Sequence, residues 1–189
     1  MKRYRQLVTY FKESYHPNRL YSALFMTVAL AVCLHLTSVQ IGVHQPLKAT
    51  QGTVQLLDLM PFRDVDDSYI QLEAYSERGR SVYWYSCLIL DSLFPLSFGI
   101  LFIYLLVLLY RNSRWELVII WPLLIVISDL LENSTTAVLL LNYPNRVESV
   151  AQLGSIFTSF KWSFIVIFVG LLGLGLWIRK NKKLTNYFF

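Results

Sequence analysis

Four charged residues stand inside long apolar runs of the sequence and are its clearest candidates for chemistry. They are Asp91, Asp129, Glu132 and Lys161. Burying one charge at the centre of a membrane costs at least ~2.5–3.5 kcal/mol, so such residues usually face a protein interior or a water-filled cavity. Carboxyl groups there can exchange protons with a ligand, and an ammonium group can orient the ligand or stabilise negative charge. We therefore take these four residues as candidate catalytic groups.

Helical spacing adds candidate ligand-binding residues around this set, namely His35, Asn133, Thr158 and Trp162. Thr158 and Trp162 fall on the same helical face as Lys161. One further stripe follows i, i+3, i+4, i+7 spacing and consists of Asp129, Glu132, Asn133 and Thr136. On the first apolar run, a ridge recurs every four residues at Ala23, Thr27, Ala31 and His35. Small residues at this spacing predict close packing against a neighbour, which would point His35 inward.

The composition indicates that a lipid bilayer surrounds the elements that position these residues. Hydrophobic residues make up 55% of the 189 residues and charged residues only 15%. A membrane-spanning helix needs ~20 mostly apolar residues. Four segments qualify, at about 20–42, 82–110, 115–141 and 150–178. The predicted fold class is all-α: a four-transmembrane-helix bundle that forms a single membrane domain over residues 1–189.

Lysine and arginine residues predict the orientation of this bundle. They precede the first span, occupy the short second loop and follow the fourth span: Lys2, Arg3, Arg5, Lys12, Arg19, Arg111, Arg114, Arg179, Lys180, Lys182 and Lys183. The positive-inside rule then places both termini in the cytoplasm and the long first loop, 43–81, outside. The positive charge lies beside apolar runs, which is typical of topology signals and not of a nucleic-acid groove.

The long outer loop is expected to contain a short interfacial helix. Asp66, Asp67 and Ser68 offer an N-cap for a helix over 69–78, which Gly79 would end. Two interpretations remain open for the loop, a cap lying in the membrane interface and a lid over a cavity. The cap is favoured because interfacial amphipathic segments are common.

The candidate residues are expected to lie in one layer of the outer half of the membrane. At about 1.5 Å per residue, His35 lies ~10 Å below the outer end of its helix, Asp91 and Glu132 ~13 Å, and Lys161 and Asp129 ~17–18 Å. Pro95 has no N–H to give to the carbonyl of Asp91, so a kink and a free acceptor are expected there. A small-residue ridge at Ala151, Ser155, Ser159 and Ser163 is suited to contact with another helix.

The charges in this layer do not cancel, because three carboxyl groups accompany one lysine. Our hypothesis is that Lys161 pairs with Asp129 or Glu132 while another carboxyl group keeps its proton. The two cysteines, Cys33 and Cys87, form no Cys-x-x-Cys pair, so we expect no metal site and no cofactor.

Several segments resemble a family of small four-helix bacterial integral membrane proteins. The similarity lies in 90–96 (LDSLFPL), 129–133 (DLLEN) and 157–162 (FTSFKW), with 57–59 and 79–80 in the outer loop. The resemblance implies the four-helix architecture, a shared site and a multi-pass location in the bacterial cytoplasmic membrane. It implies no activity.

Three functions remain open at this stage, and enzymatic activity is undecided. The first is a cavity that binds a lipid-like molecule and acts on it by acid–base chemistry. The second is a non-catalytic accessory protein that docks to a membrane protein partner or to a second copy of itself. The third is a proton-coupled transporter, for which four helices are few. Hydrolase signatures are absent from the sequence, so none of them names a reaction.

Overall fold

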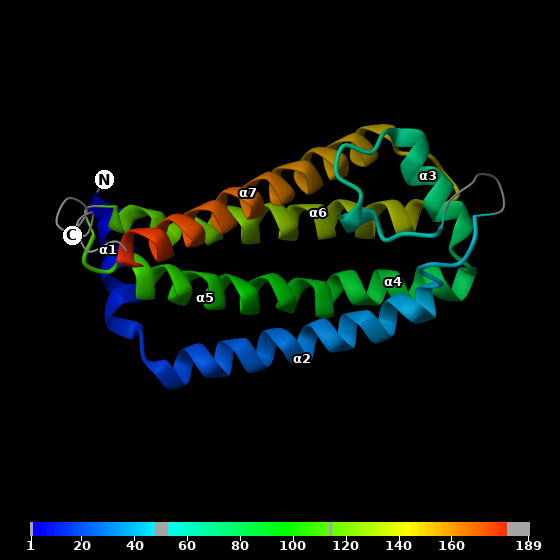
Figure 1. Cartoon of the computed structure of the whole chain (residues 1–189). Coiled ribbons are helices and arrows are strands. Elements are labelled where there is room, and N and C mark those ends of the chain that lie inside the picture. The colour runs from blue at the N-terminus through cyan, green and yellow to red at the C-terminus, as the bar shows by residue number, and fades with distance from the viewer. Residues whose placement is uncertain (1, 48–52, 114, 181–189) are drawn as a thin grey trace.

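The computed structural model of the chain, shown in Figure 1, describes residues 2–47, 53–113 and 115–180. All regular elements within these residues are helical. The α-helices are α1 (Lys2–Ser14), α2 (Pro17–Ile41), α3 (Val65–Ala74), α4 (Glu77–Leu88), α5 (Leu90–Tyr110), α6 (Pro122–Asn142) and α7 (Glu148–Lys180). Two short 3₁₀ helices, η1 (Leu57–Leu59) and η2 (Glu116–Ile120), complete the described elements. The predicted all-α fold class is confirmed.

Four helical segments are long and apolar enough to cross a membrane. They are Pro17–Ile41, Glu77–Tyr110, Glu116–Asn142 and Glu148–Lys180. Each overlaps one of the four spans predicted from hydropathy. The largest difference is at the start of the second, which begins five residues earlier than 82. There the Ser76 hydroxyl accepts a hydrogen bond from the backbone N–H of Gly79, and this cap lets the helix begin in polar sequence.

The four long helices lie side by side, and the short elements cover the two ends of the bundle (Figure 1). At one end, α1 lies across the bundle near the last turns of α7; we call this the terminal end. At the opposite end lie α3 and the long loop, and we call this the loop end. Helix α2 packs on α4 and α5, while α6 packs on α4, α5 and α7.

The structure corrects the position of the short helix in the long loop. It was predicted at 69–78, but α3 begins at Val65 and ends at Ala74. Its N-cap is Asp64, whose side chain accepts from the N–H of Asp67, while the Asp67 side chain accepts from the N–H of Asp64. This reciprocal capping box satisfies two N–H groups together, which the predicted cap does not.

Gly79 does not end a helix, as the sequence had suggested, but lies inside α4. A Cβ atom at this position would lie 2.8 Å from the backbone oxygen of Ile41, at the end of α2. The glycine is needed for close approach of two helices, a role that sequence alone does not distinguish from a helix stop.

The second long apolar segment is interrupted at Ile89, between α4 and α5, a break that the sequence analysis did not predict. Ile89 has φ −113° and ψ −70°, and its N–H bonds to the carbonyls of Tyr85 and Ser86. Pro95 lies six residues further along, inside α5. The break places Asp91 in the first turn of a new helix, where its side chain can turn toward α6 and α7.

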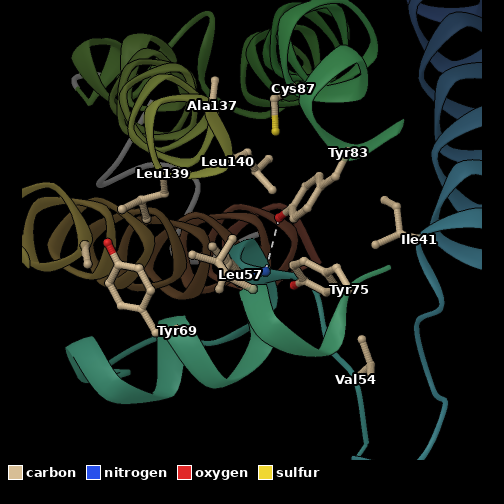
Figure 2. Close-up of a cluster of buried hydrophobic side chains, with 12 residues drawn as sticks. Ile41, Val54, Leu57, Tyr69, Tyr75, Tyr83, Cys87, Ala137, Leu139 and Leu140 are labelled. Atoms are coloured by element: carbon tan, nitrogen blue, oxygen red, sulfur yellow. Dashed lines mark hydrogen bonds between the residues drawn. The ribbon is translucent and has the colours of Figure 1, made fainter. Parts of the chain in front are cut away.

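Two separate clusters of buried hydrophobic side chains hold the bundle together. The loop-end cluster, shown in Figure 2, comprises Ile41, Val54, Leu57, Tyr69, Leu72, Tyr75, Tyr83, Cys87, Ala137, Leu139, Leu140 and Ala151. The terminal-end cluster comprises Val8, Phe98, Ile103, Leu106, Val107, Leu109, Tyr110, Ile119, Ile125, Val126 and Phe168. In Figure 2, Leu57 of η1 lies among side chains of the spanning helices, and the Tyr83 hydroxyl accepts from its N–H at 3.1 Å. The long loop is therefore part of the core.

Candidate functional site

Lys161 forms an ionic cluster with Asp129 and Glu132 between α6 and α7. Its Nζ lies 2.6 Å from Glu132 Oε2 and 3.3 Å from Asp129 Oδ1. The three residues are 5%, 7% and 0% exposed, so water screens these charges weakly. The predicted pairing of Lys161 is confirmed, and it involves both carboxyl groups. We call these three residues the Lys161 cluster.

Thr158 joins the Lys161 cluster to Arg63, a residue that sequence reasoning missed. The Thr158 hydroxyl lies 2.6 Å from Glu132 Oε1 and accepts a hydrogen bond from Arg63 Nη1 at 2.8 Å. Arg63 is only 5% exposed, and burial lowers the pKa of its guanidinium while the nearby Glu132 charge opposes that shift. Its position in a polar loop after Pro61 resembles that of any surface arginine. We found no sequence signal that would have identified it.

Arg63 also holds the backbone of η1. Its Nη1 donates to the carbonyl of Leu57 at 2.7 Å, and its Nε donates to Ser68 Oγ at 3.1 Å. These bonds fold the segment 57–63 into a compact turn around the guanidinium. One side chain thus connects the long loop, α3 and α7.

Two serines of the α7 ridge, Ser155 and Ser159, bind this loop, whereas the sequence had suggested contact with another helix. Ser159 Oγ accepts from the N–H of Phe62 at 2.9 Å, and Ser155 Oγ donates to the carbonyl of Arg63 at 2.6 Å. The indole Nε1 of Trp162 donates to the carbonyl of Asp58 at 3.0 Å. η1 therefore reaches the turn of α7 that carries Lys161, and the loop packs on the helices there.

A cavity of about 230 Å³ lies beside the Lys161 cluster, and residues from all four long apolar segments and η1 form its wall. Three carboxyl groups and one ammonium group face it, from Asp58, Asp91, Asp129 and Lys161. The other lining residues are Leu34, Thr37, Ile41, Leu56, Leu59, Tyr83, Ser86, Phe94, Phe98, Trp162 and Ile165. Asp91, Asp129 and Lys161, which were predicted to lie near one another, thus line one cavity. Asp58 is an addition from the loop.

Asn133 supports Asp91 through the backbone. Its Nδ2 donates to the carbonyl oxygen of Asp91 at 2.5 Å. This is the acceptor that Pro95 leaves without its helical partner. The predicted free carbonyl is therefore correct, and the amide on α6 satisfies it and fixes the first turn of α5.

The Asp91 carboxyl group itself has one long hydrogen bond and no ion pair among the described residues. Ser86 Oγ lies 3.4 Å from its Oδ2, and no lysine, arginine or histidine of the described ranges lies within 4.0 Å of it. Asp58 is similar, because its buried Oδ1 accepts no hydrogen bond from the part of the chain that the structure describes. Two carboxyl groups that form no ion pair with a described residue within 4.0 Å therefore share the cavity wall.

His35 does not point into the bundle, and the expectation that it does is wrong. Its side chain is exposed on α2, and Leu34 and Thr37 line the cavity instead. A four-residue spacing advances about 400° around a helix of 3.6 residues per turn. The ridge that begins at Ala23 therefore drifts by ~40° at each step and, at His35, has rotated ~120° away from the packed face.

The remaining predicted site residues divide into lining and supporting groups. Trp162 lines the cavity and is 36% exposed. Asn133, Thr158 and Glu132 are buried and stand behind the cavity wall, where they hold Asp91, Arg63 and Lys161. Within the described residues there is no group of three or more His, Cys, Asp or Glu side chains arranged to hold a metal ion.

Comparison of the chain with protein-family models, with curated proteins and with solved structures found no match. The geometry of the cavity and of the Lys161 cluster is therefore the evidence on which a function must be argued.

Proposed function

We propose that the protein is a multi-pass protein of the bacterial cytoplasmic membrane that binds a lipid-like small molecule in this cavity and acts on it by acid–base chemistry. Both termini lie in the cytoplasm in this proposal, because the basic residues gather at the terminal end and in the loop between the second and third spans. The cavity then lies in the outer half of the bilayer.

The observation that carries the proposal is the composition of the cavity wall, where carboxyl groups that form no close ion pair stand beside apolar side chains. Asp58 and Asp91 supply the polar part, and Phe94, Phe98 and Ile165 are among the apolar part. Drug-sized ligands occupy pockets of ~300–1,000 Å³. A cavity of about 230 Å³ fits the polar end of an amphiphile and the first part of its chain. The rest of the chain would lie in the surrounding lipid.

The geometry suggests a division of roles among the candidate catalytic residues. Asp91 and Asp129 line the cavity, so in this proposal they exchange protons with the ligand. Lys161 lines it as well and orients the ligand's polar end. Glu132 does not line it but holds the Lys161 ammonium at 2.6 Å, so we assign it a positioning role. Carboxyl groups in unlike surroundings suit such work, because one can donate a proton while the other accepts one.

Co-purification of a ligand tests this proposal. The protein is extracted directly into lipid nanodiscs, and bound small molecules are identified by mass spectrometry. We expect a molecule that is present with wild type and lost with Asp91→Asn or Asp129→Asn. The matched control is Glu148→Gln, a carboxyl change at an exposed site. Equal recovery from all variants, or no molecule with wild type, contradicts the proposal.

A second candidate function, a non-catalytic accessory or assembly protein, is supported by a separate observation. The Lys161 cluster, Thr158 and Arg63 form one connected network that fastens the long loop to α6 and α7. A network of this kind can exist to fix helix register and loop position. A stoichiometric membrane protein partner in the same nanodiscs, with no small molecule, would favour this function.

A further inference from the structure

The cavity wall carries more negative than positive charge. Asp58, Asp91 and Asp129 face the cavity, and Lys161 is the cation that lines it within the described residues. That ammonium is closest to Glu132, which lies behind the wall. Arg63 forms no ion pair with a described carboxyl group, since its printed hydrogen bonds go to backbone carbonyls and hydroxyl groups. A ligand that brings positive charge would complete this balance.

Hydrogen-bond acceptors also outnumber free donors on the wall. Asp129 is more than nine-tenths buried, and only its Oδ1 has a partner among the described residues. Asp58 Oδ1 is buried and accepts no bond from them. The donors of Trp162 and Ser86 already bond to the Asp58 carbonyl and the Asp91 carboxyl group. Because buried acceptors without donors are costly, the missing donors are expected from the ligand.

Aromatic side chains complete the wall around these acceptors. Four aromatic residues line the cavity: Tyr83, Phe94, Phe98 and Trp162. Each comes from a helix that also contributes a polar lining residue. The negative face of an aromatic ring attracts a cation, and organic ammonium groups are commonly bound by carboxylates together with aromatic rings. Two independent features of the wall, its charge and its rings, thus favour the same ligand chemistry.

The rim of the cavity shows where an alkyl chain would leave. Leu59 and Trp162 line the cavity and are 49% and 36% exposed, so the cavity meets the molecular surface beside them. This surface lies at the level of the spanning helices and would contact lipid. A chain leaving there would pass from the cavity into the acyl region of the bilayer.

From these features, and resting on the proposed function, we infer that the ligand is an amphiphilic amine. Its ammonium group contacts Asp58 and Asp91, the rings of Phe94 and Trp162 surround it, and its alkyl chain leaves past Leu59. A primary ammonium group has three N–H donors and no acceptor, and it would supply the positive charge that the wall lacks.

The test compares three probes that share one chain length: hexadecylamine, hexadecanol and hexadecanoate. Each is added to the full-length protein in phosphatidylcholine nanodiscs, and bound molecules are counted by native mass spectrometry. We expect the amine to bind at one copy per protein and the other two to bind at least about tenfold more weakly, because a charge-assisted hydrogen bond contributes about that factor or more.

Variants show whether the amine occupies this cavity or only the bilayer. Asp91→Asn should weaken amine binding about 10- to 100-fold. Thr37→Phe fills the cavity from α2 without touching a charge, and it should abolish binding even if the Asp91 variant folds poorly. Val32→Phe places the same side chain on the exposed face of α2 and serves as the matched control. If Asp91→Asn and Thr37→Phe bind the amine as tightly as wild type and the Val32→Phe control do, the inference is overturned.

Failure of this inference can be told apart from failure of the proposed function. If hexadecanol or hexadecanoate binds as tightly as the amine and Thr37→Phe blocks it, the ligand class is wrong while the cavity stands. If no probe binds and no molecule co-purifies, both are overturned.

Discussion

The two ends of the bundle are held together by different physical means. At the terminal end, packing is apolar and aromatic, with Phe102 and Phe168 stacked at a ring distance of 4.1 Å. Tyr110 there donates to the carbonyl of Leu171 at 2.7 Å, and an ion pair at this end, Lys12 to Glu116, has side chains 30% and 37% exposed and is not buried. At the loop end, helices and loop meet through buried charges, with Lys161 and Arg63 at the centre.

This contrast indicates which end of the bundle carries the free-energy cost of burying charged groups. An apolar interface such as the terminal end needs no desolvation of charge. The loop end carries that desolvation in several residues, and continuum estimates find that apolar replacements of buried ion pairs are often equally stable. The charged end is therefore where function is expected, and its behaviour on mutation should differ in kind from that of the apolar end.

The largest expected effect on stability comes from removing the lysine of the Lys161 cluster while its two carboxyl groups remain. Lys161→Met removes the cation that Glu132 and Asp129 share, leaving buried carboxyl groups unpaired. We expect a loss of about 3–5 kcal/mol in the free energy of unfolding. Thermal or denaturant unfolding in nanodiscs measures it.

The control for this change removes all three partners together. The triple variant Asp129→Asn, Glu132→Gln, Lys161→Met removes the three charges of the Lys161 cluster together, so none of the three is left without its partner. If the cluster is kept for function, the triple variant should be as stable as wild type or more so. A triple variant that is less stable than Lys161→Met alone would show that the cluster mainly holds the bundle together.

The apolar end should lose stability without losing ligand. Phe168→Ala removes a side chain that is 2% exposed and stacked on Phe102, and we expect a loss of about 3 kcal/mol. Ligand recovered per folded protein should stay at the wild-type level. Loss of the ligand from folded Phe168→Ala protein would contradict the separation of the two ends.

Adding one methyl group tests how closely α6 and the loop approach α7. A Cβ at Gly154 would lie 2.9 Å from Thr135 Oγ1 and 3.1 Å from Arg63 Nη2. Gly154→Ala should therefore cost about 1–3 kcal/mol, since both side chains must move. Gly173→Ala is the matched control, because no atom lies within 4 Å of a Cβ there. Equal melting temperatures of the two variants would disprove this close contact.

The smallest expected effect concerns the bond between the loop and the serine ridge. Ser159→Ala removes the acceptor of the Phe62 N–H and should cost about 0.5–1.5 kcal/mol. Protease cleavage near Phe62 should become faster, as the loop separates more often from α7. Ser163→Ala, on the same helix but bonded only to the Ser159 carbonyl, should show neither change. Identical cleavage rates in the two variants would show that this bond does not hold the loop.

Spacing along a helix predicted the site well where the residues compared lie within about one helical turn of each other. Asp129, Glu132 and Asn133 do share a buried stripe, because three or four residues make one turn. The same logic failed for His35, where a four-residue repeat was carried across three turns and its angular drift was ignored. Arg63 and Asp58 could not be found at all, since no periodicity connects a loop to the helix it contacts.

Hydrophobic run length and intrahelical spacing are properties of the sequence itself, and they determined the four long apolar helical segments and the buried stripe of α6 that contains Asp129 and Glu132. These features follow from local rules, namely rise per residue and the cost of charge in lipid. Only the tertiary structure decided that η1 enters the bundle, that Arg63 bonds to Thr158, and that Asp58 joins the cavity. The physical reason is that a loop's position depends on which distant hydrogen-bond partners and apolar surfaces it can satisfy together, and no local rule contains that information.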